Sequence, residues 1–331
     1  MKAFWMTALC AAGMGCAFGL QAQTQAQTSV QWKLATGYRA ESFHTRNLVQ
    51  FAQEVQTASS GALHIEVHAN NTLAKLADIP AAVQGGKAQA GETIMTSLVA
   101  DMPIAGADAV PFVVHSYADA RRMWTLQRPL IDAHFARKGL KALYAVPWPP
   151  QGLFSIAPVK SAADFKGTRM RTYNPGTVRI AELLGATPVD VPMVEVNKAL
   201  AAGQLDSMIT SALTGVENQV WGQVRQYYSI DAWFPKNIVF VNQQAFDALP
   251  PPVRQAVTKA AAEAETRGWA MSEAIAQESV GELQRKGIKV ERPTAELNAD
   301  LKRLGERFSR EWVRSVGGEA NQLFIPYYTQ R

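Results

Sequence analysis

The sequence predicts an α/β protein of two lobes with a ligand cleft between them, and three observations lead to this fold class. Short β-prone runs alternate with amphipathic helical stretches along most of the 331 residues, as in sheets covered by helices. The length corresponds to about two domains of ordinary size. One helical stretch, residues 251–286, would extend for about 54 Å at 1.5 Å per residue and is long enough to brace both lobes.

In the first half, apolar runs predict strands, and apolar residues spaced three and four apart predict helices. Residues 63–68, for example, alternate Leu, Ile and Val with His, Glu and His, the pattern of a half-buried strand. A helix that begins at Tyr117 ends before Gly139. The strands predicted in this half are 30–36, 63–68, 88–96 and 141–146, and the helices are 44–59, 79–86 and 117–138.

In the second half, the turn Asn174-Pro175-Gly176 separates a strand from a helix, and Pro251 and Gly287 mark the two ends of the long helix. The strands predicted here are 153–158, 170–173, 205–210 and 237–242, and the helices are 177–184, 194–202, 214–221, 251–286 and 295–315. No Gly/Ser linker divides the chain, so we expect it to cross between the lobes more than once. The expected division is residues 28–150 plus about 238–270 in lobe I, and 151–237 plus about 271–331 in lobe II.

The first 22 residues have the pattern of a secretory signal peptide. Lys2 is the only charged residue there, and an apolar run follows to Leu20. Cleavage is expected after Ala22, with Gly19 and Ala26 as the alternative sites. A retained membrane anchor is the alternative, although Ala, Gly and Cys dilute the hydrophobicity of the run. Cys10 and Cys16 both lie in this segment, so the mature protein would have no thiol or disulfide. The sequence therefore predicts an exported, periplasmic protein.

Composition and motifs exclude several classes of function. An apolar content of 47% is too high for a disordered chain. Without Lys2, the 33 basic residues become 32 against 28 acidic ones, a net charge of +4 without the clustering that nucleic acid requires. The common hydrolase, nucleotide and zinc-protease motifs are absent. His64 and His68 share a strand face but make only a weak metal site, so we expect no metal and no cofactor.

Arg169 and Arg171 stand two apart in the β-prone run after Gly167, so their side chains share one face of the strand. A guanidinium presents a planar fork of donors that matches a carboxylate. Composition alone favours surface ion pairs for both residues, but the features that follow in the chain favour a ligand site.

These features are the strand at 167–171, the segment Gly185-Ala186-Thr187-Pro188, Glu195 near a helix start, and the segment 199–206. In this order and spacing the chain resembles the extracytoplasmic solute receptors of TRAP transporters, the DctP-type binding proteins. The resemblance extends to 240–250 and back to 61–67 and 110–112, and covers most of residues 30–290. It implies a periplasmic binding protein whose interdomain cleft holds the ligand.

The resemblance also implies that Arg171 grips the ligand carboxylate, whereas Arg169 is expected to be a surface partner. Gln151 stands where many members have a second ligand arginine. Its neutral side chain favours a monocarboxylate that carries a neutral polar or ring group. Pyroglutamate, a 2-oxo acid and an aromatic acid are the expected classes.

Other cleft positions follow from the same resemblance. Tyr38 is in the loop after the first strand, Thr93 is in the strand after Gly91, and Met193 stands where some relatives have a Phe that closes over the ligand. Thr210 stands where Asn is frequent, as does Ser211. The further candidates are Trp148, Trp233 and Asn237. Core or hinge packing is the alternative for the aromatic residues, and the end of a loop for Asn237.

The predicted function is a periplasmic receptor that captures a small organic acid by lobe closure and delivers it to TRAP membrane subunits. An exported enzyme acting on organic acids is the alternative, with Glu92 or Glu195 as general base. Glu195 is equally explained by charge complementarity at a helix N-terminus, and Glu92 by a strand edge. A signalling receptor is the third possibility, and the sequence leaves monomer or dimer open.

Overall fold

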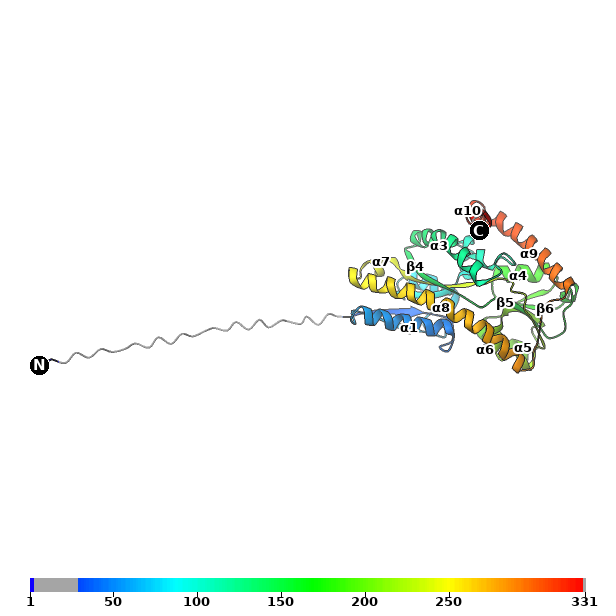
Figure 1. The fold of residues 1–331 in the computed structure, drawn as a ribbon, viewed down its shortest axis with the longest axis horizontal. Coiled ribbons are helices and arrows are strands. Elements are labelled where there is room, and N and C mark those ends of the chain that lie inside the picture. Colours follow the sequence, from blue (N-terminus) through cyan, green and yellow to red (C-terminus); the bar gives the residue numbers. More distant parts are fainter. Residues whose placement is uncertain (3–28, 330–331) are drawn as a thin grey trace.

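The computed structural model describes residues 1–2 and 29–329, and its helices pack around two β-sheets (Figure 1). Apart from its first two residues, the predicted signal peptide lies outside the described residues. The strands are β1 (Val30–Ala35), β2 (Leu63–His68), β3 (Ala90–Ile94), β4 (Leu140–Pro147), β5 (Gln151–Ser155), β6 (Arg169–Thr172), β7 (Thr187–Asp190), β8 (Ser207–Ser211), β9 (Gln226–Tyr228), β10 (Lys236–Asn242) and β11 (Lys289–Glu291). The α-helices are α1 (Phe43–Ala58), α2 (Ile79–Gln84), α3 (Tyr117–Arg137), α4 (Pro175–Leu183), α5 (Val196–Ala201), α6 (Ala212–Glu217), α7 (Gln243–Asp247), α8 (Pro251–Arg285), α9 (Ala295–Val316) and α10 (Gly318–Thr329).

The first sheet has the strand order β2-β1-β3-β10-β4. β1 is parallel to β2 and β3, whereas β10 is antiparallel to β3 and β4. In the register, Asn237 at the start of β10 is opposite Ile94 at the end of β3 and Val146 near the end of β4. The loops that follow β1, β3 and β4, and the loop that precedes β10, therefore open at one edge of this sheet.

The second sheet has the strand order β11-β9-β5-β8-β6-β7. β5 is antiparallel to β8, so Gln151 at the start of β5 is opposite Ser211 at the end of β8. β6 is parallel to β7 and β8, and Thr172 at its end is opposite Asp190. The start of β5 and the ends of β6, β7 and β8 thus lie at one edge. Together the two sheets confirm the α/β, two-lobed fold class.

The chain crosses between the sheets at least twice. β4 leads into β5 through Trp148-Pro149-Pro150, and residues 229–235 return the chain from β9 to β10. The two crossings are hydrogen-bonded to each other: the Trp148 amide donates to the Pro235 carbonyl (2.8 Å), and the Gln151 amide to the Trp233 carbonyl (3.0 Å). The cleft edges of both sheets are therefore tied at a shared hinge.

The long helix α8 braces both halves, and Figure 1 shows it running from the α7 end of the molecule to α5 and α6. It packs on α1 and β4 of the first sheet and on α6 and β11 at the second. The Trp269 indole donates to the Ala145 carbonyl of β4 (2.9 Å), which fixes the helix against the first sheet. The sequence prediction of residues 251–286 agrees with the observed 251–285.

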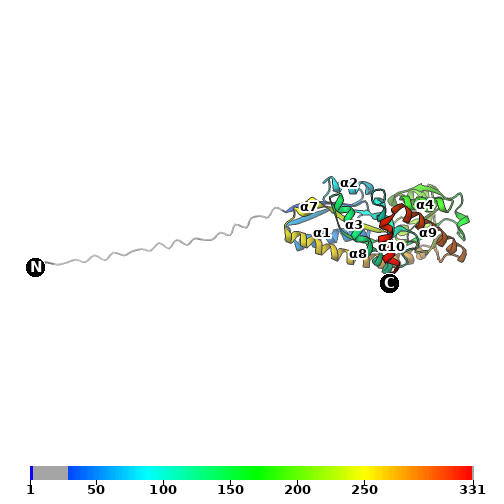
Figure 2. The same ribbon diagram turned by 90° about the horizontal axis from the view of Figure 1, so that it is seen from above.

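The elements that the sequence analysis missed are short or contain proline. β7 includes Pro188, β9 and β11 have three residues each, and α10 contains Pro326. α10 packs on α3 (Figure 2), and the Tyr327 hydroxyl donates to the Val113 carbonyl (3.0 Å). We therefore propose the predicted division into lobes with two changes: the whole of β10, from Lys236, belongs to lobe I, and so does α10.

Within residues 29–329, no helix combines the length and the apolar character needed to span a membrane. In the same residues, no group of three or more His, Cys, Asp and Glu side chains is arranged to hold a metal ion. His64 lies 3.4 Å from the Gln56 amide oxygen, and His68 forms an ion pair with Glu66 at 3.4 Å. Both histidines thus have neighbours on the protein surface.

Candidate functional site

A cavity of about 610 Å³ lies between the cleft edges of the two sheets. The first lobe contributes the loop after β1, the loop 71–77, the end of β3 and the first crossing. The second lobe contributes the start of β5, the ends of β6 and β8, and residues 190–195. The residues that line the cavity include Tyr38, Asn71, Lys75, Leu76, Ser97, Trp148, Gln151, Arg171, Tyr173, Asp190, Met193, Val194, Glu195 and Thr210. The topology of both sheets therefore brings these positions together.

Arg171 is the buried cation of this cavity. It stands near the end of β6, between β7 and β8, and is 3% exposed. Its Nε donates to the Val191 carbonyl at 2.9 Å, and the guanidinium lies 4.7 Å from the centre of the Tyr173 ring. Among the described residues it forms no ion pair within 4.0 Å. Burial lowers the pKa of Arg171 to about 10, against the opposing charges of Tyr173 and Asp190. A desolvated cation without a carboxylate partner favours an anionic ligand.

Gln151 and Tyr173 provide neutral polar groups beside this cation. The Tyr173 hydroxyl donates to Gln151 Oε1 over a long 3.5 Å, while Gln151 Nε2 donates to the Pro149 carbonyl at 2.8 Å. Burial raises the pKa of Tyr173 to about 12, so the phenol keeps its proton at neutral pH. The sequence analysis missed Tyr173, although the period of two along β6 places it on the same face as Arg171.

Aromatic residues of the first lobe form the opposite wall. The rings of Tyr38 and Trp148 lie 5.2 Å apart, and both side chains donate to the Asn237 Oδ1 atom, at 3.2 and 2.8 Å. Asn237 is fully buried and does not line the cavity. Its position behind the two aromatic side chains fixes their orientation.

The structure brings six of the nine candidate residues to the cavity, namely Tyr38, Trp148, Gln151, Arg171, Met193 and Thr210. Thr93, Trp233 and Asn237 lie behind its surface. The Thr93 hydroxyl is hydrogen-bonded to the Ser97 hydroxyl (2.9 Å between the oxygens), and Ser97 does line the cavity. Trp233 is 2% exposed and contributes its backbone carbonyl to the crossing.

The loop 71–77 was also missed, and it adds the exposed cation Lys75 to the cavity. No hydrophobic period marks this loop in the sequence. Gly37 allows it to approach β1, because a Cβ atom at this position would lie only 2.8 Å from both Asn71 Oδ1 and Leu76 Cβ. This close approach depends on two segments far apart in sequence, so a single segment gives no sign of it.

The two acidic residues considered as general bases differ in position. Glu195 lines the cavity. Glu92 is buried outside it, accepts a hydrogen bond from the Thr36 hydroxyl (2.7 Å) and pairs with His44 at 3.4 Å. The partners of Glu92 therefore explain its carboxylate as part of the lobe I core.

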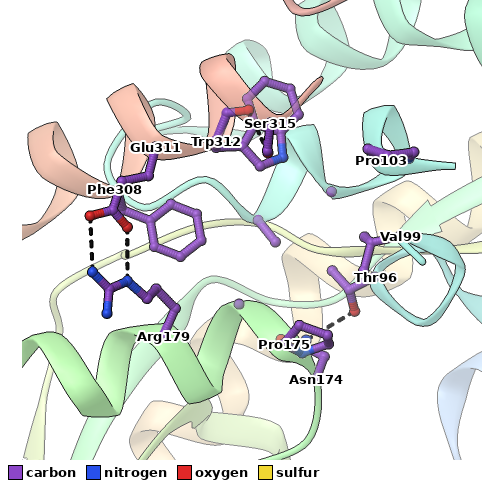
Figure 3. Close-up of a pocket in the computed structure, with 13 residues that line it drawn as sticks. Thr96, Val99, Pro103, Asn174, Pro175, Arg179, Phe308, Glu311, Trp312 and Ser315 are labelled. Carbon is purple, nitrogen blue, oxygen red and sulfur yellow. Dashed lines mark hydrogen bonds and ion pairs between the residues drawn. The ribbon is translucent and has the colours of Figure 1, made fainter. Parts of the chain in front are cut away.

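A second cavity, of about 400 Å³, lies between α4, α9 and residues 96–109 (Figure 3). Its walls include the aromatic rings of Phe308 and Trp312. Its charged groups are already paired, because Arg179 contacts Glu311 twice, at 2.8 and 2.9 Å. Asn174 donates to the Thr96 hydroxyl at 3.1 Å. The larger cavity has a buried guanidinium that forms no ion pair with any described residue, and is thus the better candidate for a ligand site.

Comparisons with known proteins show which proteins this chain resembles. A family model described as bacterial extracellular solute-binding protein, family 7 (DctP), matches residues 34–314. DctP6 of Bordetella pertussis, an extracytoplasmic solute receptor binding pyroglutamic acid, is 38% identical with a TM-score of 0.89, covering 91% of this chain and 100% of that one. A marine metagenome TRAP solute-binding protein specific for pyroglutamate is 34% identical with a TM-score of 0.88, covering 91% and 99%. The 2,3-diketo-L-gulonate-binding periplasmic protein YiaO of Escherichia coli (strain K12) is 27% identical over 260 residues, 74% of this chain and 76% of that one.

Two sheets joined by hydrogen-bonded crossings, with a buried cation in the cleft between them, define a two-lobed solute-binding protein. The chain belongs to the DctP family, the family 7 extracellular solute-binding proteins, and its structural relatives are receptors of TRAP transporters. The resemblance seen in the sequence is thereby confirmed.

Proposed function

We propose that this receptor binds a small monocarboxylate, with pyroglutamate the favoured ligand, and delivers it to TRAP membrane subunits. The observation that carries the proposal is Arg171, whose buried guanidinium donates to a backbone carbonyl and forms no ion pair within the part of the chain that the structure describes. A ligand carboxylate would accept charge-assisted hydrogen bonds from its terminal nitrogens.

The rest of the cavity favours a ligand with a single negative charge. Arg171 is its one buried cation among the described residues. The lining also includes the acidic Asp190 and Glu195 and the exposed Lys75, whose charge is screened by water. A second carboxylate on the ligand would be repelled by these two acidic side chains. The neutral groups of Gln151 and Tyr173 instead suit an amide or carbonyl, and the Tyr38 and Trp148 rings suit a small ring.

The comparisons support the same ligand class. DctP6 and the marine metagenome protein, both more than 30% identical to this chain, bind pyroglutamate by their descriptions. We also propose that the signal peptide is cleaved and that the receptor works in the periplasm without catalysing a reaction. An enzyme would need a positioned base with a proton to abstract. Of the two candidates, the buried Glu92 lies outside the cavity, whereas Glu195 lines it, so the test that follows also measures consumption of the acid.

Thermal unfolding of the mature protein against a panel of acids and neutral analogues tests this function. The protein is first unfolded and refolded to remove any bound ligand. Ligand at 100 times its Kd adds about 2.7 kcal/mol of stability, so we expect a rise of a few degrees in Tm with pyroglutamate. Pyroglutamamide, which lacks the carboxylate, should give no shift. Equal shifts with both compounds, or consumption of the acid, would contradict the proposal.

A further inference from the structure

Arg39 connects the two lobes beside the cavity. It follows Tyr38 in the loop after β1, and its side chain crosses to the second lobe. Nη1 donates to the Glu217 carbonyl at 2.9 Å, and Nη2 donates to the Val194 carbonyl at 3.3 Å. Nη2 also lies 3.5 Å from the Asn218 Oδ1 atom. One guanidinium from lobe I thus contacts three oxygen acceptors of lobe II.

The acceptors belong to two segments of lobe II, residues 190–195 and α6 with the residue that follows it, and both segments contribute lining residues to the cavity. Glu217 ends α6 and Asn218 follows it, and the last carbonyls of a helix lack partners within the helix. Asn218 is itself held, because its Nδ2 donates to the Thr214 carbonyl (2.9 Å) and its carbonyl accepts from Asn197 Nδ2 (2.7 Å). Val194 is next to Met193, and both line the cavity. Asn218 is therefore held in place by contacts within its own lobe.

Arg39 is not among the residues that line the cavity, so its contacts are with the protein and not with a ligand. The planar fork of the guanidinium can serve several carbonyls at once, which a lysine ammonium on its flexible stem does less well. These hydrogen bonds require the two lobes to be close together. They consequently stabilise the closed form relative to any form in which the lobes have separated.

We propose that Arg39 is a latch residue, which holds the lobes together over the bound acid and sets the rate at which the acid is released. The latch rests on the proposed function, since it acts on the same cleft. Arg39 is a positioning residue and contributes nothing to recognition of the carboxylate. Its loss should therefore affect release of the ligand and leave capture by the open form nearly unchanged.

Stopped-flow tryptophan fluorescence with pyroglutamate measures both rates. For Arg39→Ala we expect dissociation to be about 10- to 100-fold faster, while the association rate stays within about threefold. Arg39→Lys should lie between the two proteins. Arg46→Ala is the matched control, because Arg46 also acts on the Glu217 charge but makes no hydrogen bond to the second lobe among the described residues. An unchanged dissociation rate in Arg39→Ala, or an equal change in Arg46→Ala, would overturn the latch.

A second readout needs no ligand and so separates the latch from the choice of pyroglutamate. The only two cysteines lie in the predicted signal peptide, so Gln53→Cys on α1 and Lys198→Cys on α5 allow spin labels on the two lobes of the mature protein. Arg39→Ala should shift the distribution of distances between the labels towards longer values. The same distribution with and without Arg39 would contradict the latch, whereas failure of wild-type protein to bind any acid would contradict the proposed function alone.

Discussion

At the scale of single residues, charge pairing separates Arg171 from the other arginines nearby. Arg169, two positions earlier, forms an exposed ion pair with Asp206 at 2.7 Å, as expected for a surface partner. Arg179 pairs with Glu311. Arg171 is buried and contacts a carbonyl and a ring instead. An exposed pair contributes little to stability. A buried and incompletely paired cation lowers stability, and a ligand-binding role explains why the protein retains it.

Glu217 gives a prediction at this scale. Burial raises the pKa of its carboxyl from 4.5 to about 7. The positive charges of Arg39 and Arg46 lower this pKa, and the negative charge of Glu41 raises it further. The native state therefore binds this proton more tightly than the unfolded state. The free energy of unfolding should fall as the pH rises from about 4.5 to 7. Above that window the contribution of Glu217 should be constant.

The size of this effect is at most about 3.5 kcal/mol, at about 1.4 kcal/mol for each unit of pKa shift. Urea unfolding of wild type and Glu217→Gln at several pH values between 4 and 8 measures it. The variant should lack this part of the pH dependence and should be the more stable protein at pH 7.5. Identical pH profiles for the two proteins would show that Glu217 does not titrate in this window.

At the scale of elements, strong patterns were predictable and weak ones were not. The strict alternation of β2 and the proline and glycine at the ends of α8 identify these elements from the sequence alone. β9 and β11 have three residues each, which is too short for a period to be seen in the sequence. They form by pairing with each other, and β9 also pairs with β5. Pro326 interrupts the helical pattern of α10, which forms because Leu323, Phe324 and Tyr327 are buried.

Two glycines of α8 make a matched pair for a test. A Cβ atom at Gly268 would lie 2.4 Å from Val146 Cγ2 and 2.8 Å from Asn47 Nδ2, whereas at Gly281 the nearest atom is Arg285 Nη1 at 3.4 Å. Alanine is a better helix former than glycine by about 1 kcal/mol. Gly281→Ala should therefore stabilise the protein by up to about 1 kcal/mol.

Gly268→Ala should instead destabilise it by about 1–3 kcal/mol, since overpacking outweighs the gain in helix propensity. Denaturant unfolding of both variants measures the two free energies. A gain in stability from Gly268→Ala would mean that α8 is not packed against β4 as closely as described.

At the scale of the whole molecule, the site arises from topology. The crossings after β4 and before β10 bring Trp148 and Gln151 to the edge where β6 presents Arg171. Arg171 was predicted from the family resemblance, because strand parity alone places Arg169 and Arg171 on the same face and does not choose between them. Lys75 and Asn71 could not be predicted, because their loop reaches the cleft only through its approach to Gly37. Thr93, Trp233 and Asn237 were predicted near the cleft, and burial places them behind its surface.

Isothermal titration calorimetry of the refolded mature protein with pyroglutamate tests the central claim most directly. Removing one partner of a buried charge pair costs about 2–5 kcal/mol, so Arg171→Ala should lose at least about 30-fold in affinity. Arg169→Ala, on the same strand but exposed, should bind within about threefold of wild type. Binding by Arg171→Ala as tight as that of wild type would contradict the claim that the buried guanidinium holds the ligand carboxylate.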